Sequence, residues 1–236
     1  MKFSIKLIAA TILTSMTTVA MATENTALSN LGLSFSGSAA ITSDYRFRGI
    51  TQTQNDPAIQ AGFTLAHTSG LYFGLWGSNV DFGEDSPSLE LVGVLYYNYP
   101  SDSDLNWVEL YGKLGFKDAI ISGDNILTNV NYTNDYAGLD GDSWNFNVGY
   151  TVPFGSTGFG GIASVGYTTV DKDKYDFNGD DNYVDWKAGV TYGFKSVSGL
   201  TAELAAIGTN IDTDGMSHAG ERAVETGAVF TLAKSF

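Results

Sequence analysis

The feature that most constrains the fold is an alternation of apolar with small or polar side chains. In residues 33–48, Leu33, Phe35 and Phe47 stand at odd positions, whereas the even positions are small, polar or charged. A two-residue period places alternate side chains on opposite faces of a β-strand. The alternation recurs at 59–66, 107–116, 184–194, 200–207 and 223–236, and more weakly at 71–80, 89–98, 119–132, 144–152 and 159–170. The sequence therefore predicts an all-β, antiparallel protein.

The first segment has the features of an export signal. Residues 1–22 begin with two lysines, continue with an apolar stretch and end on Ala-Met-Ala before Thr23. This layout is typical of a secretory signal peptide. The alternative is an N-terminal membrane anchor, which needs roughly 20 apolar residues, more than this stretch offers. We expect a signal peptide over 1–22 and one domain over 23–236. No later run reaches that length, so a membrane location would require a β-barrel.

Composition excludes several function classes. The chain has 26 acidic and 12 basic residues, for a net charge of −14, which argues against binding nucleic acid through a basic surface. It has no cysteine, so disulfides, thiolate metal sites and cysteine nucleophiles are excluded. Only His67 and His218 could supply imidazole. We expect no cofactor.

The C-terminal strand favours the outer membrane. Phe230, Leu232 and the terminal Phe236 share one face of residues 223–236. An alternating strand that ends in phenylalanine resembles the C-terminal signature of outer-membrane barrels, which the barrel-insertion machinery recognises. Lys234 departs from that signature, because its position is usually hydrophobic. The alternative is a soluble β-sandwich that happens to end in phenylalanine. Together with the signal peptide and the alternation, this end predicts a transmembrane barrel in a Gram-negative outer membrane.

The loop assignment has one internal conflict. Bacterial barrels of one chain have even strand numbers, with short periplasmic turns and longer outer loops. We count eleven apolar runs, and assignments from the two ends disagree by one strand within 81–98. Most acidic residues fall in the expected outer loops. One interpretation is that these residues share divalent cations with lipopolysaccharide; the alternative is that they are simply solvated. These loops are 49–58, 81–88, 99–105, 131–142, 171–182 and 209–222.

Several segments resemble a known family. The strings SDYRFRGITQTQNDPAIQAGF (43–63) and GLYFGLWGSNVDFG (70–83) resemble the TorF family of predicted porins, as do SLEL (88–91), GVLYYNYP (93–100) and TNDYAG (133–138). Relatives carry SLEL and the GVLYYNYP segment on separate strands joined by a turn, whereas here the two run together. The resemblance implies a barrel of 12 strands (range 10–12) with a deletion at this place. It implies no solute.

The inward faces carry the candidate pore residues. If the apolar faces point to lipid, charges of both signs point into the barrel, where facing charges select solutes. The alternative is a narrow barrel filled by paired charges, as in barrels of roughly 8 strands. The candidates are Asp44, Arg46, Arg48, Glu90, Glu109, Lys113, Asp185, Lys187, Glu203 and Glu225.

Two further chemistries receive little support. Asp171, Asp173 and Asp176 alternate as in a calcium loop, but Asp176 occupies the position where an EF-hand needs glycine. Ser217 and His218 are adjacent in an outer loop, which is weak evidence for a nucleophile and its base. We expect no enzyme and no metal site.

The sequence thus predicts an outer-membrane porin-like channel for passive diffusion of small hydrophilic solutes. The alternative is a closed structural or adhesin-like barrel that acts through its acidic loops. Expected partners are outer-membrane lipid, lipopolysaccharide, the insertion machinery and the solutes, with no nucleic acid. The oligomeric state cannot be read from the sequence.

Overall fold

The computed structural model describes residues 26–69, 71–83, 86–93 and 96–236, so the expected signal peptide lies outside the described residues. The strands are β1 Leu33–Thr42, β2 Arg46–Phe47, β3 Ile50–Thr51, β4 Ala58–His67, β5 Tyr72–Asn79, β6 Leu89–Gly93, β7 Tyr96–Asn98, β8 Trp107–Val108, β9 Leu110–Lys117, β10 Asn125–Thr133, β11 Ser143–Pro153, β12 Phe159–Val170, β13 Asn182–Gly193, β14 Leu200–Thr209 and β15 Gly227–Ser235. Short helices are α1 Thr26–Ser29, η1 Ser103–Leu105, η2 Tyr136–Gly138 and α2 His218–Val224.

The strands form a nearly closed antiparallel barrel. One sheet of thirteen strands has the order β8-β7-β6-β5-β4-β1-β15-β14-β13-β12-β11-β10-β9, and β2 with β3 form a separate pair. The first and last wall strands, β1 and β15, pair with each other. The two ends of the sheet, β8 and β9, are separated only by Glu109, so the chain itself completes the wall. The predicted antiparallel barrel is confirmed, and the strand number is close to the expected twelve.

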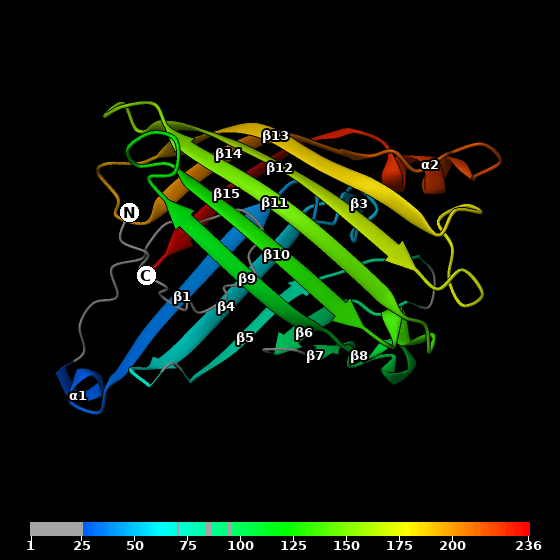
Figure 1. Cartoon of the computed structure of the whole chain (residues 1–236), viewed down its shortest axis with the longest axis horizontal. Helices are drawn as coiled ribbons and strands as arrows, with labels where there is room; N and C mark the ends of the chain where they lie inside the picture. Colours follow the sequence, from blue (N-terminus) through cyan, green and yellow to red (C-terminus); the bar gives the residue numbers. More distant parts are fainter. Residues whose placement is uncertain (1–25, 70, 84–85, 94–95) are drawn as a thin grey trace.

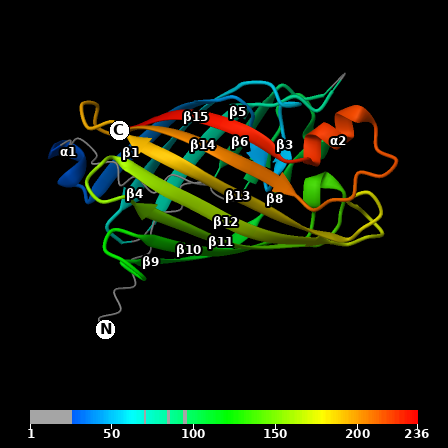
Figure 2. The same ribbon diagram turned by 90° about the horizontal axis from the view of Figure 1, so that it is seen from above.

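The barrel has two different ends. We call the end that holds the start of β1 and the C-terminal Phe236 the terminal end, and the opposite end, which holds the longer connections and α2, the loop end (Figures 1 and 2). The tilted strands run between these ends. Long connections gathered at one end and short turns at the other are typical of outer-membrane barrels.

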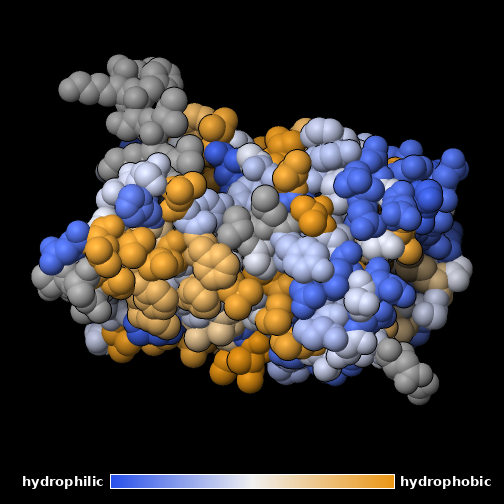
Figure 3. Space-filling model, turned by 90° about the horizontal axis from the view of Figure 1, so that it is seen from below, coloured by the Kyte–Doolittle hydropathy of each residue, from blue (hydrophilic) through white to orange (hydrophobic). Residues whose placement is uncertain are grey.

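The two faces of the wall differ in polarity. Outward side chains such as Ile59, Leu114 and Val165 are exposed, whereas inward Gln60, Thr168 and other polar side chains are buried. Figure 3 shows apolar side chains over the terminal half of the visible face and hydrophilic ones at the loop end. The described residues contain no helix that is both long and apolar enough to span a membrane.

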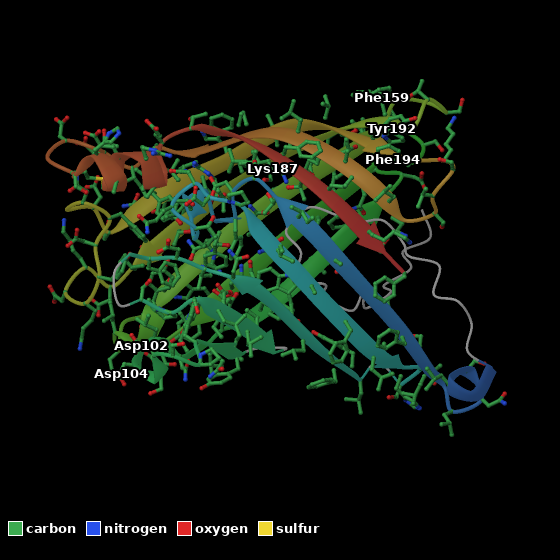
Figure 4. All side chains as sticks on the ribbon, turned by 180° about the vertical axis from the view of Figure 1, so that it is seen from behind. Asp102, Asp104, Phe159, Lys187, Tyr192 and Phe194 are labelled. Atoms are coloured by element: carbon green, nitrogen blue, oxygen red, sulfur yellow. The ribbon has the colours of Figure 1, made fainter. Side chains whose placement is uncertain are left out.

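Aromatic rings gather near the terminal end. Phe159 lies 4.7 Å from Tyr192, and Tyr192 lies 5.0 Å from Phe194, measured between ring centroids. Figure 4 places these rings at one end of the barrel and Asp102 and Asp104 at the other. Aromatic girdles flank the lipid-facing band of outer-membrane barrels, and these rings lie where such a girdle is expected.

The β9–β10 turn corrects one predicted strand. The weaker alternation at 119–132 predicted a strand from residue 119, but β10 begins at Asn125. The carboxylate of Asp124 accepts hydrogen bonds from the backbone N–H groups of Ala119 (2.6 Å), Ile120 (2.9 Å) and Ile121 (2.9 Å). These bonds fold residues 118–124 into a turn, because they replace the partners that a strand would supply.

The conflict within 81–98 resolves into a short hairpin. Strands β6 and β7 pair through Leu91 with Asn98, Val92 with Tyr97 and Gly93 with Tyr96. The segment predicted as one weak strand at 89–98 is therefore two strands. Both are much shorter than the ten residues of β4, so the hairpin spans only part of the wall.

Candidate functional site

The first connection folds into the barrel instead of extending away from it. The alternation predicted one strand over 33–48 with Tyr45 and Phe47 facing outward, but β1 ends at Thr42. Tyr45 is buried in the aromatic core and Phe47 packs against that core. This prediction was wrong because the side chain of Asp44, two residues beyond β1, accepts hydrogen bonds from later residues of the connection. These bonds turn the chain into the barrel.

Asp44 organises the connection. Its carboxylate accepts hydrogen bonds from Thr51 Oγ1 (2.5 Å) and Asn55 Nδ2 (3.3 Å). Arg46 Nε donates to the same carboxylate at 2.6 Å, and the side chains of both ion-pair members are below 10% exposed. A buried carboxylate is stable only when its oxygens are paired and hydrogen-bonded. These contacts therefore fix the chain from residue 44 to residue 55 as one unit.

Strands β2 and β3 form a tight hairpin at the tip of this unit. Arg46 pairs with Thr51 and Phe47 with Ile50. The two turn residues, Arg48 and Gly49, have φ of 49° and 84°. Positive φ at both central residues is characteristic of a type I′ turn, whose twist matches paired strands. Arginine rarely adopts this conformation, so contacts at the tip must hold it there.

The tip of the hairpin contacts distant strands of the wall. Arg48 forms an ion pair with Glu109 between β8 and β9, and the side chains are 8% and 6% exposed. The hydroxyl of Tyr183 on β13 donates to the carbonyl oxygen of Arg48 at 3.1 Å. A Cβ atom on Gly49 would lie 2.6 Å from Cγ2 of Thr209 on β14. The hairpin thus spans the interior of the barrel near its loop end.

Aromatic rings surround the hairpin. Tyr97 and Trp107 stack with centroids 4.2 Å apart, and Trp107 lies edge-on to Tyr136 at 5.5 Å. Phe177 lies 4.4 Å from Tyr183 in a similar edge-on contact. Burial desolvates the hydroxyl of Tyr136, in the loop at 134–142, and raises its pKa well above the ordinary value. The hydroxyl of Tyr136 therefore stays neutral, and the rings pack around the hairpin.

Some polar atoms at this level remain available. Within the described part of the chain, neither Arg48 Nη1 nor Asp185 Oδ2 has a hydrogen-bond partner, although both atoms are buried. Buried polar groups are normally satisfied by protein or by water. These atoms therefore offer a donor and an acceptor to water or to a polar solute near the hairpin.

The burial of inward side chains varies along the wall strands. On β11, inward Asn145 is buried whereas inward Asn147 is half-buried. On β13, Asp185 is buried, whereas Lys187 is half-buried and forms an ion pair with Glu203. Figure 4 places Lys187 between the two ends of the barrel. On β14 the order is reversed, because inward Thr201 and Glu203 toward the terminal end are buried. Burial of the inward side chains therefore differs from strand to strand.

The ten pore candidates fall into two groups. Glu225 is exposed next to α2, and only its backbone carbonyl oxygen joins the site, as an acceptor from Arg46 Nη1 at 2.6 Å. The others lie within the barrel, where the structure brings together Arg48 with Glu109, Arg46 with Asp44, and Lys187 with Glu203. Glu90 lies near Tyr45 (3.4 Å), and Lys113 lies over the ring of Tyr111 (4.8 Å). That they line a pore stays a prediction.

Sequence reasoning missed the aromatic part of the site. Tyr45 and Phe47 were assigned to the outer face because strict alternation was extended through residue 48. A local signal was present, because Arg48-Gly49 stands between Phe47 and Ile50, and glycine at the second position of such a pair suits a two-residue hairpin turn.

The remaining candidates lie away from the hairpin. Phe230, Leu232 and Phe236 are exposed on the outer face of β15 and its end. Asp171 and Asp176 each accept a backbone N–H, from Asp173 (3.1 Å) and Gly179 (2.6 Å), and the described residues contain no group of three acidic or histidine side chains able to hold a metal.

Ser217 and His218 are engaged locally. Ser217 Oγ accepts the N–H of Gly220 at 3.2 Å and caps α2. His218 Nδ1 lies 3.6 Å from Glu221 Oε2, with the imidazole 85% exposed. Because the hydroxyl oxygen of Ser217 serves as a helix cap and the ring of His218 points to Glu221, the pair offers no visible nucleophile–base contact. That the protein is no enzyme stays a prediction.

Comparison with known proteins assigns the chain to a family. A family model described as "Bacterial protein of unknown function (Gcw_chp)" matches residues 26–91 and 89–236. The chain belongs to the Gcw_chp family. The Gcw_chp match comes in two pieces that meet within β6, at the place where the wall hairpin is short.

Other comparisons are less informative. No curated protein matches the chain. Among solved structures, this Gcw_chp chain is similar to one described as "NanC porin structure in rhombohedral crystal form", with 11% identity and a TM-score of 0.46. The similarity covers 86% of this chain and 98% of that one.

Proposed function

We propose that the protein is an outer-membrane channel for passive diffusion of small hydrophilic solutes, constricted by the β2–β3 hairpin. The observation that carries this proposal is the hairpin itself, which crosses the lumen and joins Arg48 to Glu109. Fixed charges of opposite sign at the narrowest level of a pore create a local field that discriminates among solutes.

The wall supports a membrane location. Its outer face carries exposed Leu, Val, Ile and Phe side chains, and large exposed apolar surfaces mark membrane or protein contacts. The resemblance of residues 43–83 to the TorF family of predicted porins points the same way. In this placement the acidic loops face the lipopolysaccharide, and the insertion machinery reads the end of β15.

A second candidate is a closed barrel that acts through its loops. The stacked rings of Tyr97 and Trp107 and the buried ion pairs near the loop end favour it, because they leave little open space there. Barrels of roughly 8 strands are filled in this way, whereas wider ones can hold a channel.

Single-channel recording separates the two candidates. The chain 23–236 is refolded and inserted into planar bilayers, with insertion checked by heat-modifiable gel mobility. We expect discrete ohmic steps that become larger when residues 46–51 are replaced by a short glycine linker. An inserted barrel that stays silent with and without the hairpin would overturn the channel and favour the closed barrel.

A further inference from the structure

The described connections at the loop end carry more acids than bases. The connection between β12 and β13, residues 171–181, contains five aspartates and two lysines, and all of these side chains are exposed. The loop at 134–142 contains three aspartates and no base. Figure 4 places Asp102 and Asp104 at this same end. Charges of one sign around an opening raise the local concentration of ions of the opposite sign, so this end favours cations.

Inside the barrel, most bases are balanced by carboxylates. Three of the four basic pore candidates form ion pairs, which are Arg46 with Asp44, Arg48 with Glu109 and Lys187 with Glu203. Because an ion pair has no net charge, it attracts neither anions nor cations over a distance. The fourth base, Lys113, lies over the ring of Tyr111, four positions beyond Glu109 toward the terminal end.

Asp185 is an acid beside the hairpin that lacks such a balance. A Cβ atom on Gly49, at the hairpin tip, would lie 3.0 Å from the Cβ of Asp185. Asp185 is 6% exposed, and among the described residues its Oδ2 has no hydrogen-bond partner and its carboxylate has no ion pair. Glu90 also lacks an ion pair, but its Oε1 accepts the hydroxyl of Tyr45 at 3.4 Å. The fixed charge beside the hairpin tip that no base balances is therefore negative.

We propose that the channel prefers cations, and that the carboxylate of Asp185 selects them beside the hairpin. This inference rests on the proposed function, because it names the class of solute that the channel passes. A buried carboxylate needs a hydrogen-bond donor or a positive charge next to it. Since the described residues supply neither to Oδ2 of Asp185, a cation or its hydration water fills this role as it passes the hairpin.

Anions are disfavoured by the same arrangement. An anion that enters from the loop end meets the acidic connections first and the carboxylate of Asp185 next, and both repel it. Arg48 Nη1 also lacks a hydrogen-bond partner within the described part of the chain. The charge of Arg48 is balanced by Glu109, however, so this N–H suits hydration water better than an anion.

Reversal potentials in a gradient of KCl test the preference. The chain 23–236 is refolded and inserted into planar bilayers, and the potential of zero current gives the ratio of K⁺ to Cl⁻ permeability. We expect the unchanged protein to favour K⁺ several-fold. Asp185→Asn removes the charge with little change of shape and should bring the ratio closer to one. Lys113→Gln removes a base that has no ion pair among the described residues and should raise the ratio.

Asp118→Asn is the matched control, because it removes one carboxylate charge outside the lumen. Asp118 is exposed in the β9–β10 turn, and its Oδ1 accepts the N–H of Gly123 at 2.6 Å, as the oxygen of asparagine can. Its φ of 54° also suits asparagine. The control should leave the permeability ratio unchanged.

The outcomes separate this inference from the channel itself. Discrete steps with a ratio of one, or with a preference for Cl⁻, would overturn the cation preference and leave the channel intact. Equal decreases for Asp185→Asn and Asp118→Asn would overturn the role of Asp185. If Asp185→Asn does not refold, an unchanged ratio in Lys113→Gln would show that the inward charges do not set the selectivity. An inserted barrel that stays silent would overturn the channel and the cation preference with it.

Discussion

At the scale of single residues, Asp124 shows how one carboxylate defines a turn. Desolvation alone would raise the pKa of Asp124, but hydrogen bonds from the backbone at 119–121 and from the hydroxyl of Tyr150 (2.9 Å) hold it below its ordinary value. A group whose pKa is lower in the folded state stabilises that state above its unfolded pKa. This stabilisation is lost as the pH falls through the folded pKa.

Asp124→Asn should therefore lower the stability of the barrel at neutral pH. The difference from the unchanged protein should shrink at acidic pH, as the pH falls below the ordinary pKa of an aspartate and through the lower folded-state pKa of Asp124. Urea unfolding in detergent, followed by tryptophan fluorescence at both pH values, measures the effect. Asp180→Asn, in an exposed loop, is the control and should change little. A deficit of the same size at both pH values would contradict the assigned role of the charge.

At the scale of elements, the β2–β3 hairpin depends on close contact with the wall. Gly49 has positive φ, and a Cβ there would lie 2.6 Å from Thr209 Cγ2 and 2.9 Å from the carbonyl oxygen of Gly208. Gly49→Ala should displace the hairpin from the wall and raise the channel conductance. The backbone strain alone should cost on the order of 1 kcal/mol of folding stability.

Gly215→Ala separates strain from contact. Gly215 has a φ of 80°, similar to that of Gly49, but a Cβ there would meet no described atom within 4 Å. Its substitution should cost a similar strain and leave conductance unchanged. If both variants raise conductance equally, or if neither does, the contact between hairpin and wall does not set the constriction.

At the scale of the whole molecule, the wall closes where the last strand meets the first. The N–H of Phe236 donates to the carbonyl oxygen of Gly37 at 2.9 Å, and the N–H of Gly37 donates back at 2.8 Å. Phe236→Ser keeps these backbone bonds but removes the exposed ring. We expect fewer assembled barrels in outer-membrane fractions and unchanged refolding in detergent, since only assembly in cells requires recognition of the ring.

Phe154→Ser is the matched control for this variant, because Phe154 is also an exposed ring, in the turn between β11 and β12. Its membrane fraction should equal that of the unchanged protein. Equal losses for both variants would mean that any exposed ring matters, and that Phe236 carries no specific signal.

The sequence predicted the wall of the barrel more accurately than its interior. Alternation assigned Phe35 to the outer face and Glu203 to the inner one, as observed. It did so because the period-two geometry of a strand is local. It failed at Tyr45 and Phe47. The alternation continues through these residues, but β1 ends at Thr42, and hydrogen bonds to Asp44 fold the following residues into the barrel.

The sequence by itself determined the antiparallel barrel and the polarity of its two faces, because each strand carries its own alternation. Only the tertiary structure decided which charges meet, since Arg48 and Glu109 lie 61 positions apart. It likewise decided that β6 and β7, within SLELVGVLYYNYP, pair as a short hairpin. Strand pairing and hairpin placement depend on contacts between distant segments, and no local pattern records those contacts.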